Sequence, residues 1–237
     1  MGHGKNPSPP HTARMPSRLA GLARVWISLL LGGCASTELV LYKVARADPK
    51  QAHTYVEATP EEARQGLQVS RGGQQIGVAV PMPLAMGDVI ETLPNTVAVI
   101  RFPDGHEATL LPANQVQLGS LWARFGEIFV RVFKQAQDTT FKVKTAYVTA
   151  GVVGTEFWVR VGRHDASVEL GVVEGRVSLA SNAGLWTPVG VLRKEVATVL
   201  RDAPPSKAAR QRASVDAIVQ WMRGGLLPLS PPPLPHK

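Results

Sequence analysis

The stretch that most constrains the fold of this chain is 141–161, in which two alternating segments flank a pair of glycines. The apolar or small positions that alternate with charged or aromatic residues are Phe141, Val143, Thr145, Phe157, Val159 and Val161. Alternation with a period of two is typical of half-buried β-strands. Between the segments lie Gly151 and Gly154, and glycine allows a positive φ or the close approach of another strand. The stretch therefore predicts two β-strands joined by a connection that depends on glycine.

The composition favours an all-β fold. Glycine supplies 22 and proline 19 of the 237 residues, and helical periodicity is scarce before the C-terminus. A domain of short strands and many turns fits these numbers. The chain has one cysteine, so an internal disulfide framework is excluded and the fold must be stabilised by its core. The predicted β-rich body, 67–202, is long enough to bury such a core.

Turn signals divide this body into hairpins. Asp104-Gly105 lies between two alternating apolar runs, and in that setting an Asp-Gly pair is the strongest short-range hairpin signal. The other predicted turns lie at Gly72-Gly73, at 163–165 and at Glu174-Gly175. The segment 121–134 fits both a helical face and a strand. Its β-branched and aromatic residues favour a strand over 127–134.

The tetrad Gly154-Thr155-Glu156-Phe157, with Gly87-Asp88 near the start of the body, resembles the FecR domain, the extracytoplasmic part of iron-citrate-type sigma-factor regulators. The resemblance extends over 67–200. It implies a jelly-roll-like antiparallel β-sandwich in the periplasm. The positions that match the family motif, and that are candidates for an interaction, are Gly151, Gly154, Thr155, Glu156, Phe157, Trp158, Asp104, Gly105, Glu174 and Gly175.

The chain also departs from the family pattern. In complete regulators two parts precede the domain: a cytoplasmic segment that controls a sigma factor, and then a transmembrane helix. The domain precedes another domain that contacts an outer-membrane transporter. Here fewer than 25 residues precede the apolar segment, and Val153 stands where the family often has arginine. We therefore expect a stand-alone member rather than a direct sigma-factor antagonist.

The first part, 1–34, has a basic start and a short apolar segment that ends in Cys34. This layout is typical of a secretory signal, and the apolar run is too short to span a membrane. Leu31-Gly32-Gly33 before Cys34 resembles a bacterial lipobox, so we favour lipidation of that cysteine. Ordinary signal cleavage after Ala47 and an uncleaved anchor through 39–41 remain open. All three alternatives place the following linker, 35–66, and the body outside the cytoplasm.

After the predicted β-rich body, the spacing of the apolar residues changes from strand-like alternation to a helical period. Ser206 is a candidate helix cap, and Val215, Ile218, Val219 and Met222 follow at the i, i+3, i+4, i+7 spacing of a helix. The sequence therefore predicts one C-terminal helix within 203–225 that packs against the β-body. The proline-rich tail, 226–237, is expected to be extended.

The sequence holds no recognised catalytic motif. The six histidines form no pair at metal-ligand spacing, and phosphate-binding loops and nucleophile elbows are missing. Glu156 with Asp104 or Glu174 could be drawn as a carboxylate pair for hydrolysis. However, carboxylates and hydroxyls at strand ends more often bond to unpaired backbone N–H groups. We predict a protein that is not an enzyme and that needs no cofactor or metal.

Three tryptophans are candidates for either core packing or binding. We expect Trp122 and Trp186 to belong to the core. Trp158 alternates with Phe157 and Val159, so it lies on the face opposite theirs. That face is either covered by a second layer or part of a binding surface, and the sequence leaves both open.

The net charge of +8 does not indicate a nucleic-acid partner. Four of the 26 basic residues and no acidic residue lie in the first 33 positions, so the remainder carries +4. A small excess of positive charge that is distributed along the chain is typical of a solvated surface. Two functions remain. One is a sensory or interaction module in envelope signalling, with a membrane regulator or a TonB-dependent transporter as partner. The other is a structural envelope protein that binds peptidoglycan or another glycan.

Overall fold

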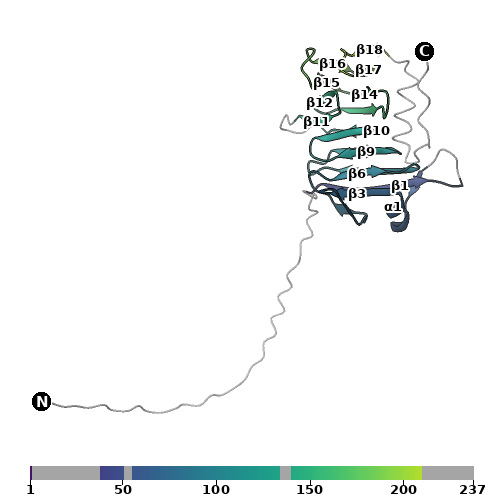
Figure 1. Cartoon of the computed structure of the whole chain (residues 1–237), viewed down its shortest axis with the longest axis vertical. Helices are drawn as coiled ribbons and strands as arrows, with labels where there is room; N and C mark the ends of the chain where they lie inside the picture. Colours follow the sequence, from purple (N-terminus) through teal and green to yellow (C-terminus); the bar gives the residue numbers. More distant parts are fainter. Residues whose placement is uncertain (2–37, 51–54, 134–139, 210–237) are drawn as a thin grey trace, which may run out of the picture. The chain divides into compact units, whose positions relative to one another are not determined.

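The structure is a computed structural model, and it describes Met1 and residues 38–50, 55–133 and 140–209. The chain divides into two units, Met1–Ala35 and Ser36–Lys237, and all the described strands and the helix belong to the second. Within the described ranges there are 18 strands and one short helix. Figure 1 shows the strands one above another, from β1 and β3 at one end to β16 and β17 at the other.

One set of strands, sheet A, is antiparallel throughout. In spatial order it contains β2 (Tyr55–Glu57), β1 (Val40–Ala47), β7 (Thr96–Arg101), β8 (Glu107–Leu110), β10 (Leu121–Arg131), β13 (Glu156–Val161), β14 (Ser167–Glu174), β17 (Glu195–Leu200) and β18 (Ser206–Ala209). The short strand β5 (Met82–Pro83) also pairs with β1.

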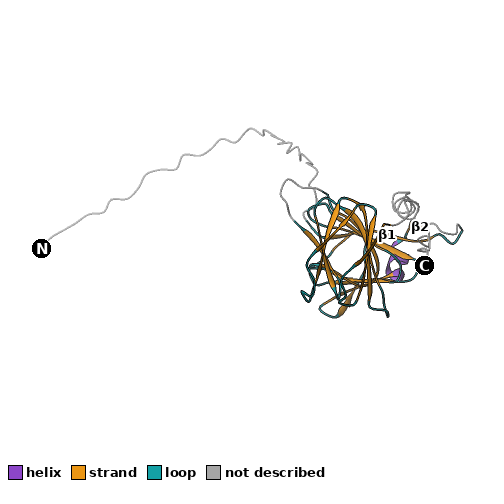
Figure 2. Cartoon of the chain, turned by 90° about the horizontal axis from the view of Figure 1, so that it is seen from above, coloured by secondary structure: helices purple, strands orange, loops and turns teal. Residues whose placement is uncertain are grey.

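The second set, sheet B, is antiparallel except where β10 pairs with β11. It contains β4 (Gln74–Ile76), β3 (Leu67–Arg71), β6 (Val89–Thr92), β9 (Asn114–Gln117), β10, β11 (Phe141–Lys144), β12 (Val148–Val152), β15 (Arg176–Ser181) and β16 (Val189–Leu192). The inner faces of both sheets contribute to one large cluster of buried apolar side chains. Figure 2 shows the strands arranged around this common interior.

Strand β10 joins the two sheets. Its first half pairs with β9 and β11 in sheet B, and its second half pairs with β8 and β13 in sheet A. Gly126 lies at the junction with a φ of +94°, and a Cβ there would lie 2.7 Å from the Cα of Asn114. The buried Asn114 side chain donates from Nδ2 to the carbonyl oxygen of Glu127 at 2.6 Å. Only glycine satisfies both the backbone angle and the close approach at this bend.

The prediction that 35–66 is a linker is wrong from Val40 onward, because this segment contains β1, β2 and the helix α1 (Pro60–Gly66). In β1, Leu41 and Val44 are buried and the strand pairs along its length with β7. The β-body therefore begins at β1 rather than near 67. The helix α1 begins directly after Thr59, and its first turn is closed by a reciprocal capping box between Thr59 and Glu62.

This location of β1 bears on the alternatives for the N-terminus. Ala47 is the last residue of β1, opposite Tyr55 of β2, so signal cleavage after Ala47 would remove the whole strand from sheet A. That alternative is incompatible with the sheet as folded. Cys34 lies outside the described residues, as does the apolar segment before it, so lipidation stays a prediction. Among the described residues, no helix has the length and apolar character needed to span a membrane.

The C-terminal helix is not confirmed. Ser206, the expected helix cap, begins strand β18, which pairs with β17 over four residues. The rest of the predicted helix and the proline-rich tail, 210–237, lie outside the described residues. The all-β class is confirmed, and so are the hairpins at Gly72-Gly73 and Asp104-Gly105. The strand expected over 127–134 is confirmed as part of β10, which covers Leu121–Arg131. The hairpin predicted at Glu174-Gly175 is wrong, because β14 pairs within sheet A and β15 within sheet B, so this turn connects the two sheets. The jelly-roll arrangement stays a prediction.

Candidate interaction surfaces

The motif Gly154-Thr155-Glu156-Phe157, at the start of β13, holds two turns of the chain against each other. The Thr155 hydroxyl is buried and lies 3.0 Å from the carbonyl oxygen of Arg176 and 3.1 Å from that of Val153. Gly175 approaches the same hydroxyl so closely that a Cβ there would lie 2.8 Å from Thr155 Oγ1. Gly154 and Gly175 both have a positive φ. These residues fasten the turn before β13 to the turn between β14 and β15. The Thr155 hydroxyl bonds here to carbonyl oxygens, whereas the sequence analysis expected bonds to backbone N–H groups.

The remaining motif residues divide between the two faces of sheet A. Phe157 is fully buried in the main core. Trp158 points to the opposite face, where it forms a second apolar cluster with Phe129, Val173 and Val196. Its side chain is 1% exposed, so of the two open possibilities the covered one is confirmed. Trp158 is therefore not a solvent-facing binding residue in this structure.

Cross-strand register aligns the neighbours of Trp158 in a line that runs perpendicular to the strands. We call this line the apolar row of sheet A, and from β7 to β17 it consists of Val99, Thr109, Phe129, Trp158, Gly171 and Val196. Each member is paired directly with the next. Because side chains alternate along a strand, all six positions lie on the face away from the main core.

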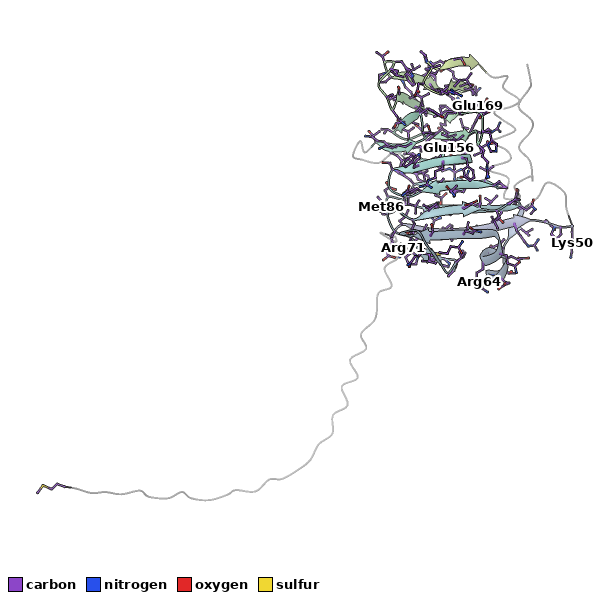
Figure 3. All side chains as sticks on the ribbon, viewed as in Figure 1. Lys50, Arg64, Arg71, Met86, Glu156 and Glu169 are labelled. Carbon is purple, nitrogen blue, oxygen red and sulfur yellow. The ribbon has the colours of Figure 1, made fainter. Side chains whose placement is uncertain are left out.

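Charged residues border the apolar row on both sides. On one side Arg101, Glu107, Arg131 and Glu156 are paired in register, with Arg101–Glu107 and Arg131–Glu156 ion pairs of 2.8 Å. On the other side Arg160 bonds to Glu127 at 2.7 Å and to Glu169 at 3.5 Å. Figure 3 marks Glu156 and Glu169, one from each of these charge ladders. The Glu156 carboxylate is thus held by the Arg131 side chain.

The outward face of sheet B is different, because its tryptophan is open to solvent. Trp122 is 44% exposed, which makes the prediction that it belongs to the core wrong, whereas Trp186 packs against the core as expected. Trp122 lies between Gln117 and Lys144 in the cross-strand register. The Arg124 guanidinium lies 5.9 Å from the centre of the indole ring.

A shallow groove begins at Trp122 and continues over the next strands of sheet B. We call it the Trp122 groove, and its polar lining comes from Gln117, Lys144, Thr149, Ser181 and Asn182. Thr149 donates to the Asn182 amide oxygen at 2.7 Å, and the Asn182 amide nitrogen donates to the carbonyl oxygen of Thr145 at 2.9 Å. The groove therefore combines one exposed aromatic ring with polar groups whose positions are fixed by hydrogen bonds.

The Asp104-Gly105 turn anchors a buried histidine that the sequence analysis did not single out. His106 is 1% exposed, and its Nε2 lies 3.3 Å from Asp104 Oδ2. The Phe133 backbone N–H donates to His106 Nδ1 at 3.1 Å, and the ring contacts Phe133 and Phe141. Burial lowers the pKa of His106 more than the nearby Asp104 carboxylate raises it. Phe133 and Phe141, the aromatic residues that flank 134–139, were the sequence signal that could have indicated a buried partner such as His106.

The Gly87-Asp88 pair also has a structural role. The Asp88 carboxylate is fully buried and accepts from Arg71 Nε and Nη2 at 2.8 and 2.9 Å. It also accepts from the Ala85 backbone N–H at 2.8 Å. These hydrogen bonds, the one from Arg71 first, lower the pKa of Asp88. Gly151 lies in the middle of β12, paired with Lys142 and Ser178.

The structure does not gather the candidate residues into one catalytic centre. Glu156 and Glu174 are paired in register, while the Asp104 carboxylate lies in the β7–β8 turn beside His106. In the described part of the chain, no group of three His, Cys, Asp or Glu side chains is placed to hold a metal ion. The motif instead joins turns and supplies residues to both faces of sheet A.

The fold and these surfaces define an all-β domain of two sheets that share one strand. Residues 88–178 match the model of the family described as FecR protein. The family resemblance is therefore confirmed for 88–178, a shorter range than the 67–200 expected from the sequence. FecR domains are extracytoplasmic domains of regulators. No curated protein matches the chain.

Two solved structures are similar to the chain. Both are crystal structures of a candidate anti-sigma factor from Parabacteroides distasonis ATCC 8503, at 1.65 and 2.50 Å resolution. Each is 18% identical with a TM-score of 0.48, and the matches cover 56% and 57% of this chain. They cover 64% of each of those chains, so this chain spans less than two thirds of their length.

Proposed function

We propose that the chain is a non-enzymatic, extracytoplasmic interaction module in envelope signalling, and that the Trp122 groove is its binding surface. The observation that supports this proposal is the 44% exposure of Trp122 on the outward face of a continuous sheet. Tryptophan and arginine are enriched among the residues that dominate protein–protein binding energy, and Arg124 lies beside the indole. The FecR match supports a regulatory role.

The partner in this proposal is an envelope protein, either a membrane-spanning regulator or a TonB-dependent transporter. Lipidation of Cys34 would hold the domain close to the membrane. Only five residues separate Cys34 from Val40, where β1 begins. An extended chain of that length reaches about 20 Å, so the anchor keeps the domain at the membrane surface, within reach of such a partner.

The test is crosslinking in cells followed by pull-down of the full chain from envelope membranes. We expect a membrane regulator or transporter to be recovered with the unmodified chain and lost with Trp122→Ala. Leu192→Ala is the matched control, because Leu192 is 49% exposed on strand β16 outside the groove. Cys34→Ala tests the anchor separately. Equal recovery with Trp122→Ala would overturn the assignment of the groove.

Peptidoglycan or another glycan is the second candidate ligand, and the composition of the same groove favours it. An exposed indole with nearby amide, hydroxyl and ammonium groups suits the apolar face and the hydroxyls of a sugar. The fixed side chains of Asn182 and Thr149 supply such groups. Sedimentation with purified peptidoglycan distinguishes the two ligands. Retention of the chain on the polymer, lost in Trp122→Ala, would make the protein a structural glycan binder.

A further inference from the structure

The outward face of sheet B carries positive charge on consecutive strands that contain no acidic residue. Residues 121–126 of β10 and the strands β11, β12, β15 and β16 contain four basic residues and no Asp or Glu. The four are Arg124, Lys142, Lys144 and Arg176, and all of them are exposed. We call them the basic strip of sheet B. Figure 1 shows these strands in succession along the stack.

The basic strip differs from the outward face of sheet A, where glutamates neutralise the arginines. There Arg101, Arg131 and Arg160 each bond to a glutamate at 2.7 or 2.8 Å. Among the described residues, by contrast, no carboxylate forms an ion pair with a member of the basic strip. Lys142 and Lys144 are two residues apart on one strand, so their like charges repel each other across about 7 Å. A bound anion would relieve this repulsion.

The strand register places the four cations in single file. Along the strand direction each member lies about two residues beyond the one before it, in the order Arg124, Lys144, Lys142, Arg176. Across the strands the file runs from β10 to β15, which are three strand spacings apart. With about 7 Å for two residues and about 4.8 Å for each spacing, the file is about 25 Å long. A single file of cations matches a chain-like polyanion better than the flat headgroup layer of a membrane.

The arginines at the two ends of the strip are held with their guanidinium groups on the outward face. Arg124 donates from Nη1 and Nη2 to the Oε1 atoms of Gln115 and Gln117 at 3.3 and 3.0 Å. Arg176 leans over β16 at Gly190, where a Cβ would lie 2.7 Å from Arg176 Nη2. A guanidinium can bind the oxygens of a carboxylate or a phosphate through two parallel N–H bonds. Both ends of the strip therefore suit groups of this kind.

The groups beside the cations suit the uncharged parts of a sugar. Thr149 and Ser178 present hydroxyls on the outward face of β12 and β15, and Gly151, the partner of Ser178, adds no side chain. The indole of Trp122, 44% exposed, borders the strip beside Lys144. An exposed aromatic ring can cover the apolar face of a sugar while hydroxyls and cations bind its polar groups.

Two features disfavour a protein on the strip itself. Strands β11, β12 and β15 are each paired on both sides, so they offer no open edge to an extended peptide. Lysine, which supplies two of the four cations, is depleted in protein–protein interfaces. The observations therefore favour a polysaccharide.

We propose that the basic strip binds an acidic glycan, a polysaccharide whose carboxylate or phosphate groups contact the four cations in sequence. This ligand is additional to the protein partner proposed for the Trp122 groove, and its assignment rests on the charges of sheet B rather than on that function. The strip and the groove share Lys144, so a bound glycan would reach the edge of the groove.

Titration calorimetry of the purified full chain with defined polymers tests the proposal. Polygalacturonate supplies carboxylates and phosphomannan supplies phosphates, and methyl-esterified polygalacturonate and mannan are the matched uncharged polymers. We expect at least one acidic polymer to bind about tenfold or more tightly than its uncharged counterpart. Its affinity should fall as the salt concentration rises from about 50 to about 300 mM.

Lys142→Gln should weaken binding of the acidic polymer by about fivefold or more, because it removes a central charge of the strip. Lys50→Gln is the matched control, an exposed lysine in the turn after β1, and should leave the affinity unchanged within about twofold. Unchanged thermal unfolding establishes that both variants are folded. Lys142 does not line the Trp122 groove, so recovery of the protein partner should be the same with Lys142→Gln. The two proposals can therefore fail separately.

Several outcomes would contradict the assignment of the strip. Failure of both acidic polymers to bind, or equal binding of the uncharged polymers, would exclude recognition of an acidic glycan. An affinity that is unchanged by Lys142→Gln would place the ligand elsewhere. Tighter binding of polyglutamate would assign the strip to an acidic protein, and tighter binding of phosphatidylglycerol vesicles would assign it to a membrane surface.

Discussion

The indole of Trp158 lies against Gly171, its direct partner across β13 and β14, so closely that a Cβ at position 171 would lie 2.4 Å from the ring atoms Cε2 and Nε1. The indole ring occupies the space that a side chain at position 171 would fill. The tryptophan in the FecR-like motif and a glycine on the next strand are therefore one packing unit.

Gly171→Ala should destabilise the domain by about 1–3 kcal/mol, because the added methyl forces the ring or the strand to move. Urea unfolding at equilibrium measures the loss. Gly77→Ala is the matched control, since a Cβ at Gly77 meets nothing within 4 Å and its φ is not positive. It should change the free energy of unfolding by less than about 0.5 kcal/mol. Equal effects of both substitutions would contradict this packing.

The two outward tryptophans should differ in their contribution to stability. Trp158→Ala removes a side chain that is 1% exposed and should cost about 3–5 kcal/mol. Trp122→Ala removes one that is 44% exposed and should cost less than about 1 kcal/mol. Thermal unfolding of the two variants, side by side, measures the difference. A large loss for Trp122→Ala would mean that its ring stabilises the domain rather than being available for binding.

Asp88→Asn should weaken the domain by about 2 kcal/mol at neutral pH, because the amide cannot replace a carboxylate that accepts from Arg71 and from a backbone N–H. The pKa of Asp88 is lowered in the folded state, so its contribution is complete above the ordinary value of 3.8 and is lost as the pH falls below it. Unfolding followed from pH 7 to pH 3 measures this loss. Asp202→Asn, at an exposed position, is the control and should leave the profile unchanged.

His106 should make the domain sensitive to mild acid. Its pKa is lowered by burial, so below the ordinary value of 6.5 the unfolded chain binds a proton that the folded chain resists. Stability should be constant above pH 6.5 and should decline between pH 6.5 and 5. His106→Gln should flatten this decline, and His164→Gln, in the exposed turn after β13, should not. A slope unchanged by His106→Gln would assign the effect to another group.

The sequence predicted those parts of the fold that local chemistry determines. The Gly72-Gly73 and Asp104-Gly105 hairpins follow from turn residues between alternating strands. Each of these features depends on residues within a few positions of one another. The family motif likewise identified the domain, because the turns it fastens require particular residue types.

Features that depend on distant partners were missed. Strand β1 alternates imperfectly, and it is recognisable as a strand only through its pairing with β7, over 50 residues later. The exposure of Trp122 depends on which half of β10 belongs to which sheet, and that is determined by Gly126 and Asn114 together. His106 is in a turn by sequence and is buried only because Phe133 and Phe141 close over it.

The shared strand β10 also restricts how this protein can change its length. Trp122 and Phe129 are seven residues apart on one strand, yet they face outward from different sheets. Because side chains alternate, inserting or deleting one residue between them would turn one half of the strand inside out relative to its neighbours. The hairpin tips can gain or lose residues without this consequence. Natural variation in length among related chains should therefore fall at the tips and spare 121–131.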